Sequence, residues 1–345
     1  YTKAIELKPN YANAYNNLGS AQNDVGKWEE AIINYTKAIE LKPDHPNAYD
    51  NLVKILTFYN PKTPNSNPCI LASKKLRNLK YIYNSNKQIM DEDVKSFFQT
   101  SNKIIFENTK KIEFNASQIY RRNTIDLGCE RHFKVFNTFN VIPEYCFGCY
   151  KVQVEPTTVM ELFKLFFIFD KLKLAKNNTR KCFVEMRPDV SGIYKGLIYC
   201  FSFNEAKEIQ SHLSNILNVT INKKIVTKVK RGCSEFAISY PEYNKIDKKK
   251  DQLMKYNKEW KEKEKIIDEK EQQINRSNQK IVKDSLSGIT LSDILIMRNW
   301  LIYAKKIGDL AYKSINEEIS ISPYMEKELS EQLPKRVKEF SSSFF

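Results

Sequence analysis

Nine consecutive residues occur twice in this chain, 34 positions apart. The segment Tyr1-Thr-Lys-Ala-Ile-Glu-Leu-Lys-Pro9 returns unchanged as residues 35–43, and residues 13–15 return as 47–49. A fixed period of this length is typical of stacked helical units, each of which buries its apolar face against its neighbours. The repeat therefore predicts a helical solenoid at the start of the chain.

The unit that starts at Ala12 resembles the tetratricopeptide repeat family. The matching residues are Tyr15, Leu18 and Gly19 in its first helix, Ala31, Tyr35 and Ala38 in its second, and the closing Pro43. Gln22 departs from the pattern, because the family usually has an aromatic residue there. The resemblance implies a pair of closely packed helices in each repeat, and it implies a protein or peptide as partner.

The repeat segment is expected to cover residues 1–59. One repeat cannot bury its own apolar face, so we expect further repeats before Tyr1. A helix from Asn47 to about Tyr59 has no second helix after it and is predicted to cap the array. Residues 60–68 are rich in proline and asparagine, which predicts a linker, and residues 60–128 as a whole read as this linker and a helical connector.

Residues 129–243 are predicted to form an α+β domain. Alternating and apolar segments predict four strands, and amphipathic or capped segments predict two helices. The strands are 150–155, 181–186, 195–201 and 224–229; the helices are 156–174 and 204–217; residues 234–240 are a candidate fifth strand. The order β-α-β-β-α-β is that of a ferredoxin-like fold, with an antiparallel sheet and both helices on one face.

Residues 244–345 are expected to be mainly helical. Residues 245–285 are charge-rich and predict one long helix, whose single apolar stripe is too thin for a coiled coil. A second helix is predicted from Ser292 to about Glu318, and the tail after Pro323 is expected to be loosely ordered. The fold class is thus α+β: the end of a solenoid, a ferredoxin-like domain and long C-terminal helices.

Two close pairs of metal-ligating residues precede the first predicted strand. Cys129 and His132 are followed by Cys146 and Cys149, which gives the spacing C-x2-H-x13-C-x2-C. Each pair can chelate from one tight turn, which suits a tetrahedral zinc site. The alternative is that these cysteines are ordinary buried residues.

A second group of cysteines depends on the predicted topology. Cys149, Cys182, Cys200 and Cys233 would fall at one edge of the sheet, as a thiol or iron–sulfur cluster. Arg180, Lys181, Lys230 and Arg231 would lie at the same edge. Cations lower the pKa of nearby thiols and bind phosphate or carboxylate. This pattern would suit a thiol- or metal-dependent enzyme acting on an anionic substrate, although a solvated basic rim is the simpler interpretation.

The net charge of +15 allows a nucleic-acid partner, although it also fits a general bias toward lysine. Lys195, Gly196 and Tyr199 partly resemble an RNA-recognition motif, but Leu197 stands where an aromatic residue is expected. No Ser–His–Asp order, phosphate loop, dinucleotide glycine pattern or HExxH is present, which favours a non-enzymatic protein. Seven cysteines, no visible export signal and no long apolar run favour a cytoplasmic protein without a membrane span. A protein-binding scaffold is therefore the leading hypothesis.

Overall fold

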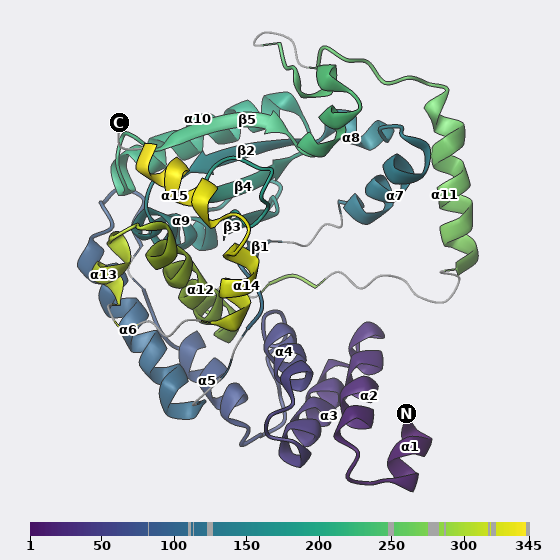
Figure 1. Cartoon of the computed structure of the whole chain (residues 1–345), viewed down its shortest axis with the longest axis vertical. Helices are drawn as coiled ribbons and strands as arrows, with labels where there is room; N and C mark the ends of the chain where they lie inside the picture. The colour runs from purple at the N-terminus through teal and green to yellow at the C-terminus, as the bar shows by residue number, and fades with distance from the viewer. Residues whose placement is uncertain are drawn as a thin grey trace.

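The computed structural model describes residues 1–81, 83–109, 112, 114–122, 127–247, 252–274, 283–285, 288–316, 318 and 322–342. Figure 1 shows the N-terminal helices at one end of an elongated molecule and a single sheet, surrounded by helices, toward the other. Within the described residues, no helix is both long enough and apolar enough to cross a membrane.

The repeat segment forms the first four helices. They are α1 (Thr2–Leu7), α2 (Ala12–Asp24), α3 (Trp28–Leu41) and α4 (Pro46–Ile55). Helices α2 and α3 approach closely because Gly19 has no side chain: a Cβ atom there would lie 2.8 Å from the Tyr35 ring. Ala31 and Ala38 are fully buried on the facing helix. The small residues singled out in the sequence therefore set the distance between the two helices.

Two helices and a short strand connect the repeat segment to the sheet. They are α5 (Pro68–Arg77), α6 (Asp91–Asn108) and β1 (Gln118–Arg121). The helices agree with the helical connector predicted for this stretch, but the strand was not predicted. β1 pairs antiparallel with β3 at one edge of the sheet.

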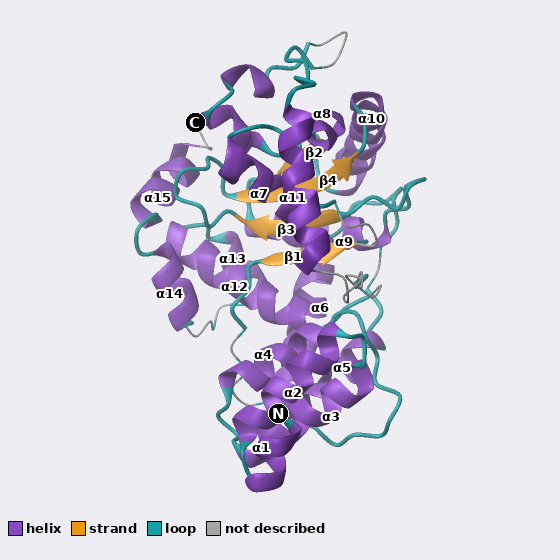
Figure 2. Ribbon diagram, turned by 90° about the vertical axis from the view of Figure 1, so that its right-hand side faces the viewer, coloured by secondary structure: helices purple, strands orange, loops and turns teal. Residues whose placement is uncertain are grey.

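The sheet has five antiparallel strands in the order β1-β3-β4-β2-β5. Figure 2 shows β1, β3, β4 and β2 in this order. The other four strands are β2 (Tyr150–Glu155), β3 (Arg180–Val184), β4 (Tyr194–Cys200) and β5 (Val226–Arg231), with helices α9 (Val159–Lys171) and α10 (Phe203–Thr220) between them. These strands and helices lie where the sequence predicted them. A Cβ atom at Gly196 would lie 2.5 Å from Leu165 of α9, so glycine in β4 lets this buried helix press against the sheet.

A smaller lobe surrounds the cysteine-rich end of the sheet. It contains α7 (Cys129–Phe139), α8 (Glu144–Gly148), the 3-10 helices η1 (Ser234–Ile238) and η2 (Pro241–Asn244), and α11 (Trp260–Ile274). The fifth strand predicted over residues 234–240 is wrong, because η1 occupies most of this stretch. Phe236 and Tyr243 turn inward into a small apolar core with Ile142 and Cys146, which a flat edge strand would not allow.

The C-terminal third also differs from expectation. The long helix predicted over residues 245–285 is helical only from Trp260 to Ile274 among its described residues, and Ile246 instead forms a β-bridge with Gln252. Helix α12 (Leu291–Ile307) ends at Gly308, whose positive φ terminates it well before Glu318, and α13 (Ala311–Ile315) follows. The expected loose tail forms α14 (Pro323–Leu329) and α15 (Leu333–Ser342). Fully buried Arg336 anchors α15 by donating to the carbonyls of Gly192 and Arg187.

One apolar core runs through most of the molecule. It extends from Ala31 in α3, through α9 and the sheet, to Phe340 in α15. Helix α12 lies at the centre of this core, and nearly all of its residues are buried. The repeat segment is therefore packed onto the α+β module and is not attached to it by a flexible linker alone.

Candidate functional site

Four cysteines from separate elements meet at one end of the sheet. Cys129 begins α7, Cys146 lies in α8, Cys149 immediately precedes β2, and Cys233 follows β5 by two residues. Strands β2 and β5 pair antiparallel, with Tyr150 opposite Arg231, so Cys149 and Cys233 emerge side by side.

Close contacts join these four residues. The amide of Cys149 donates to the carbonyl of Cys146 over 3.3 Å, which closes the Cys-x2-Cys turn. A Cβ atom at Gly232 would lie only 2.3 Å from the Cys149 sulfur, so glycine is needed for the chain to pass this thiol. The thiols of Cys129 and Cys233 lie side by side, close enough for their interaction to raise the pKa of Cys233. We refer to Cys129, Cys146, Cys149 and Cys233 as the four-thiol cluster.

Three thiols of this cluster, those of Cys146, Cys149 and Cys233, have pKa values above the usual value. Burial, followed by the nearby Cys129 thiol, raises the pKa of Cys149 to about 11. The interaction with the Cys129 thiol, and then burial, raise the pKa of Cys233 above its usual value. A nucleophilic cysteine needs the opposite shift, because the thiolate is the reactive form. These three thiols are therefore not activated for covalent catalysis.

The predicted zinc ligands Cys129, His132, Cys146 and Cys149 come together only in part. The imidazole of buried His132 stacks on Tyr145 with ring centroids 5.1 Å apart. Across the part of the chain that the structure describes, no three His, Cys, Asp or Glu side chains already surround a point as metal ligands. Any ion would have to draw the sulfur atoms together.

The alternative set of Cys149, Cys182, Cys200 and Cys233 is not brought together. Cys182 lies opposite Gly196 in the middle of β3, and Cys200 lies opposite Tyr150. Both are about 1% exposed on the sheet face that α9 and α10 cover. They are buried core residues, because strand alternation turns their side chains inward.

The predicted anion site of Arg180, Lys181, Lys230 and Arg231 is also wrong as a single site. β3 and β5 are separated by β4 and β2. Alternation places the two arginines on the helix-covered face and the two lysines on the opposite face. Arg180 is fully buried and donates to the carbonyl of Leu172.

Arg231 contacts the four-thiol cluster instead. Its guanidinium is 1% exposed, and Nη2 donates to the Cys146 carbonyl over 2.6 Å. It also lies over the rings of Tyr150 and Tyr243, 4.2 and 4.7 Å from their centroids. Its Nε and Nη1 atoms have no hydrogen-bond partner in the described residues. A buried guanidinium with two unused donors is costly unless an anion faces it.

A separate buried ion cluster fixes the loop between β3 and β4. Glu185 accepts hydrogen bonds from Arg187 and from Lys195, both over 2.9 Å. Burial alone would raise the pKa of Glu185, but these two hydrogen bonds outweigh it and lower the pKa from 4.5 to about 2.

This shift predicts an acid-dependent loss of stability. Because the folded pKa is depressed, the stabilisation is complete above about pH 4.5 and disappears as the pH falls toward 2. We expect Glu185 to contribute about 3 kcal/mol of this loss. Urea unfolding between pH 5.5 and 2.5 should show a shallower decline for Glu185→Gln than for the wild type. Glu262→Gln, on α11, changes a carboxylate whose side chain is 74% exposed and should leave the wild-type slope unchanged.

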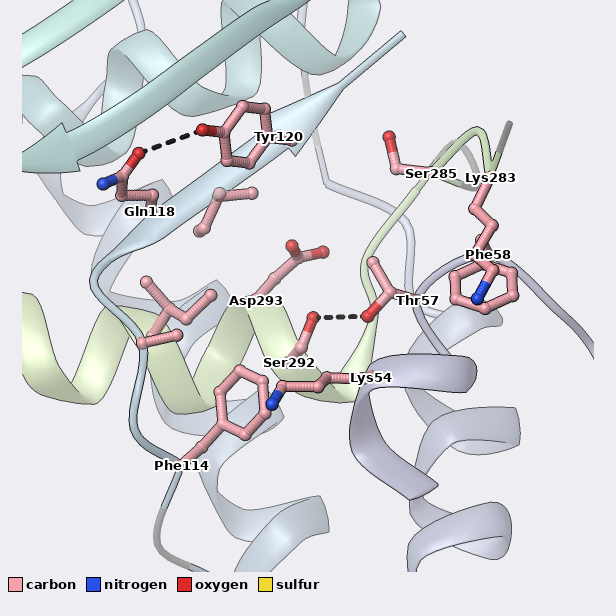
Figure 3. A pocket seen from close by; sticks show the side chains of 13 residues that line it. Lys54, Thr57, Phe58, Phe114, Gln118, Tyr120, Lys283, Ser285, Ser292 and Asp293 are labelled. Carbon is pink, nitrogen blue, oxygen red and sulfur yellow. Dashed lines mark hydrogen bonds between the residues drawn. The ribbon is translucent and has the colours of Figure 1, made fainter. Parts of the chain in front are cut away.

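A second feature lies where the repeat segment meets the α+β module. A cavity of about 300 Å³ opens between α4, β1, α12 and residues 283–285 (Figure 3). Its lining comprises Lys54, Thr57, Phe58, Phe114, Ala116, Gln118, Ile119, Tyr120, Lys283, Ser285, Ser292, Asp293 and Ile296. The Thr57 and Ser292 hydroxyls hydrogen-bond across the junction at 3.0 Å. We call this the junction cavity; sequence reasoning missed it because four distant segments build it.

The comparisons with known proteins identify the repeat segment. The family model of the tetratricopeptide repeat matches residues 12–45. Neither the curated proteins nor the solved structures gave a match. Residues 12–45 are thus a tetratricopeptide repeat, a unit whose arrays form extended binding surfaces for other proteins.

Proposed function

We propose that this protein is a protein-binding scaffold, in which the repeat segment is joined to a small cysteine-rich module in a reducing compartment such as the cytoplasm. The observation that carries the proposal is the tetratricopeptide repeat over residues 12–45. Its helices share one apolar core with the α+β module. A partner bound to the repeat would therefore be held in a fixed orientation relative to the module.

The module is proposed to be a ferredoxin-like domain with one added strand. Four strands follow the order β5-β2-β4-β3, and each neighbouring pair is antiparallel. Helices α9 and α10 occupy the two crossovers of a β-α-β-β-α-β chain. β1 extends the sheet beside β3 and links it to the repeat segment through α5 and α6.

The binding surface is proposed to run along α2 and α4 to the junction cavity. Asn51 of α4 donates to Asn16 and Ser20 of α2, which forms a polar ladder between these helices. Lys283, which lines the cavity, donates to Asn23 at the end of α2. A peptide on the ladder would thus reach an apolar cavity for one of its side chains.

Peptide selection against the full chain tests this proposal. A peptide selected from a random library should lose at least tenfold in affinity on Lys54→Glu, because this exposed α4 residue lines the cavity. Lys37→Glu is the matched charge reversal on α3, where the side chain is also exposed. It should leave the affinity unchanged. No selectable peptide, or equal losses in both variants, would reject the proposed surface.

Zinc stabilisation of the cysteine-rich end is the second part of the proposal. Zinc binds thiolates tightly, and a structural zinc site contributes directly to folding free energy. The support is the meeting of the four thiols from separate elements. The identity of the ligands is a separate question, which the contacts of Cys233 and Arg231 address.

A further inference from the structure

We infer that Cys129, Cys146, Cys149 and Cys233 together hold one zinc ion as four thiolates, with Cys233 as the fourth ligand in place of the predicted His132. This inference rests on the zinc part of the proposed function and specifies its ligands. Cys233 was predicted to belong to the thiol set at the sheet edge and not to the zinc set, because it is 84 residues beyond Cys149 in the sequence.

The backbone at this end of the sheet is built to bring Cys233 to the other thiols. Gly232 donates its amide to the Cys149 carbonyl over 2.9 Å, and its lack of a side chain leaves room for the Cys149 sulfur. Cys233 follows directly, and its thiol lies beside that of Cys129. Zinc–sulfur bonds of about 2.3 Å place tetrahedral sulfur atoms roughly 3.8 Å apart. The four sulfur atoms would have to reach these separations and lose their protons to become ligands.

The charges around the cluster favour a site of four thiolates over a site of three thiolates and one imidazole. A zinc ion with four thiolates carries two net negative charges, whereas replacement of one thiolate by neutral histidine leaves one. Two cations adjoin the cluster: buried Arg231, with its unused Nε and Nη1 donors, and Lys151, whose Nζ donates to the Gly232 carbonyl over 3.0 Å. Donors of this kind commonly hydrogen-bond metal-bound sulfur and stabilise its charge.

His132 is better placed as a neighbour of the site than as a ligand. Its ring stacks on Tyr145, and its Cε1 and Nε2 atoms lie against Gly128, 3.4 Å from where a Cβ would be. The stacked ring would have to leave this packing to reach an ion held by Cys146 and Cys149. The thiol of Cys233, in contrast, already lies beside that of Cys129.

The site is structural in character. The small lobe has its own apolar core around Phe236 and Tyr243, separate from the main core. A core of this size contributes little stability alone, and small lobes are commonly held by a metal or by disulfides. Four protein ligands also leave zinc without an open position for a substrate, which is the mark of a structural site.

Metal analysis of ligand variants tests the assignment. The full chain, purified with reductant and without added chelator, should contain about one zinc per molecule. Cys233→Ser should lose most of that zinc, whereas the matched buried-cysteine variant Cys200→Ser and the variant His132→Asn should retain it. The inference would be overturned if the folded wild type contains no zinc. It would also be overturned if His132→Asn loses the zinc and Cys233→Ser retains it.

A measurement on the wild type covers the case in which Cys233→Ser fails to fold. Alkylation followed by mass spectrometry should find Cys129 and Cys233, both half-buried, protected with zinc bound and modified after chelation. If Cys233 still reacts freely in the zinc-bound protein, the four-thiol set is rejected, but the zinc part of the proposed function is not. Absence of zinc would reject the zinc part of the proposed function as well. Neither result bears on peptide binding, which needs no residue of the cluster.

Discussion

Arg121→Met should lower the free energy of unfolding by about 3–5 kcal/mol. Arg121 is 1% exposed and bridges two buried carboxylates. Its Nε donates to Asp170 of α9 over 2.6 Å, and its Nη2 donates to Asp293 of α12 over 2.7 Å. Removal of the guanidinium leaves Asp293 buried without its cation and leaves Asp170 with only the half-exposed Lys171, 3.5 Å away. The loss therefore reflects uncompensated charge more than lost packing. Urea unfolding monitored by circular dichroism measures it.

Two variants separate this explanation from a general effect of removing charge. Lys54→Met breaks an ion pair with Asp50 whose lysine is 58% exposed, and should cost less than about 1 kcal/mol. The triple variant Arg121→Met, Asp170→Asn, Asp293→Asn should recover part of the loss, because no unpaired charge remains. A loss below about 1 kcal/mol for Arg121→Met would show that the network does not hold β1, α9 and α12 together.

The second large effect is expected from Trp300→Ala, at about 3–5 kcal/mol. Trp300 is fully buried in α12, and its ring packs edge-on against Phe163 of α9. Its Nε1 donates to the Ser117 carbonyl over 2.8 Å, immediately before β1. Alanine would leave a cavity and an unpaired carbonyl in the main core. Thermal and urea unfolding should both report the loss.

Trp300→Phe is the matched control for this substitution. It keeps most of the aromatic volume and removes only the hydrogen bond, so it should cost about 1–3 kcal/mol. Equal losses for Trp300→Ala and Trp300→Phe would contradict a cavity as the main cause. In that case the hydrogen bond to Ser117 would dominate the contribution of this residue.

The parts of the fold that could be predicted are those with a local signal. The 34-residue period located α2 and α3, and alternation located β2, β3, β4 and β5. β1 gave no such signal, because it is four residues long and places an arginine on its buried face. Arg121 is tolerated there only through Asp170 and Asp293, which lie 49 and 172 residues away. A pattern of apolar residues cannot show a pairing of that kind.

The same limit explains the result for the candidate site. The Cys-x2-Cys turn at Cys146 and Cys149 was visible in the sequence, because both residues lie in one turn. The approach of Cys233 depends on the register of β2 against β5 and on Gly232, neither of which leaves a local pattern. The predicted anion site was wrong because residues adjacent in sequence need not be adjacent in space. Arg180 and Lys181 are neighbours in the chain but point to opposite faces of a strand.

X-ray absorption spectroscopy at the zinc edge tests the four-thiol site most directly, since it counts the atoms bound to the ion. The purified full chain should show four sulfur neighbours at about 2.3 Å and no nitrogen shell at 2.0–2.1 Å. The spectrum of His132→Asn should be the same. A shell of three sulfurs and one nitrogen that changes in His132→Asn would contradict the assignment of Cys233 as the fourth ligand.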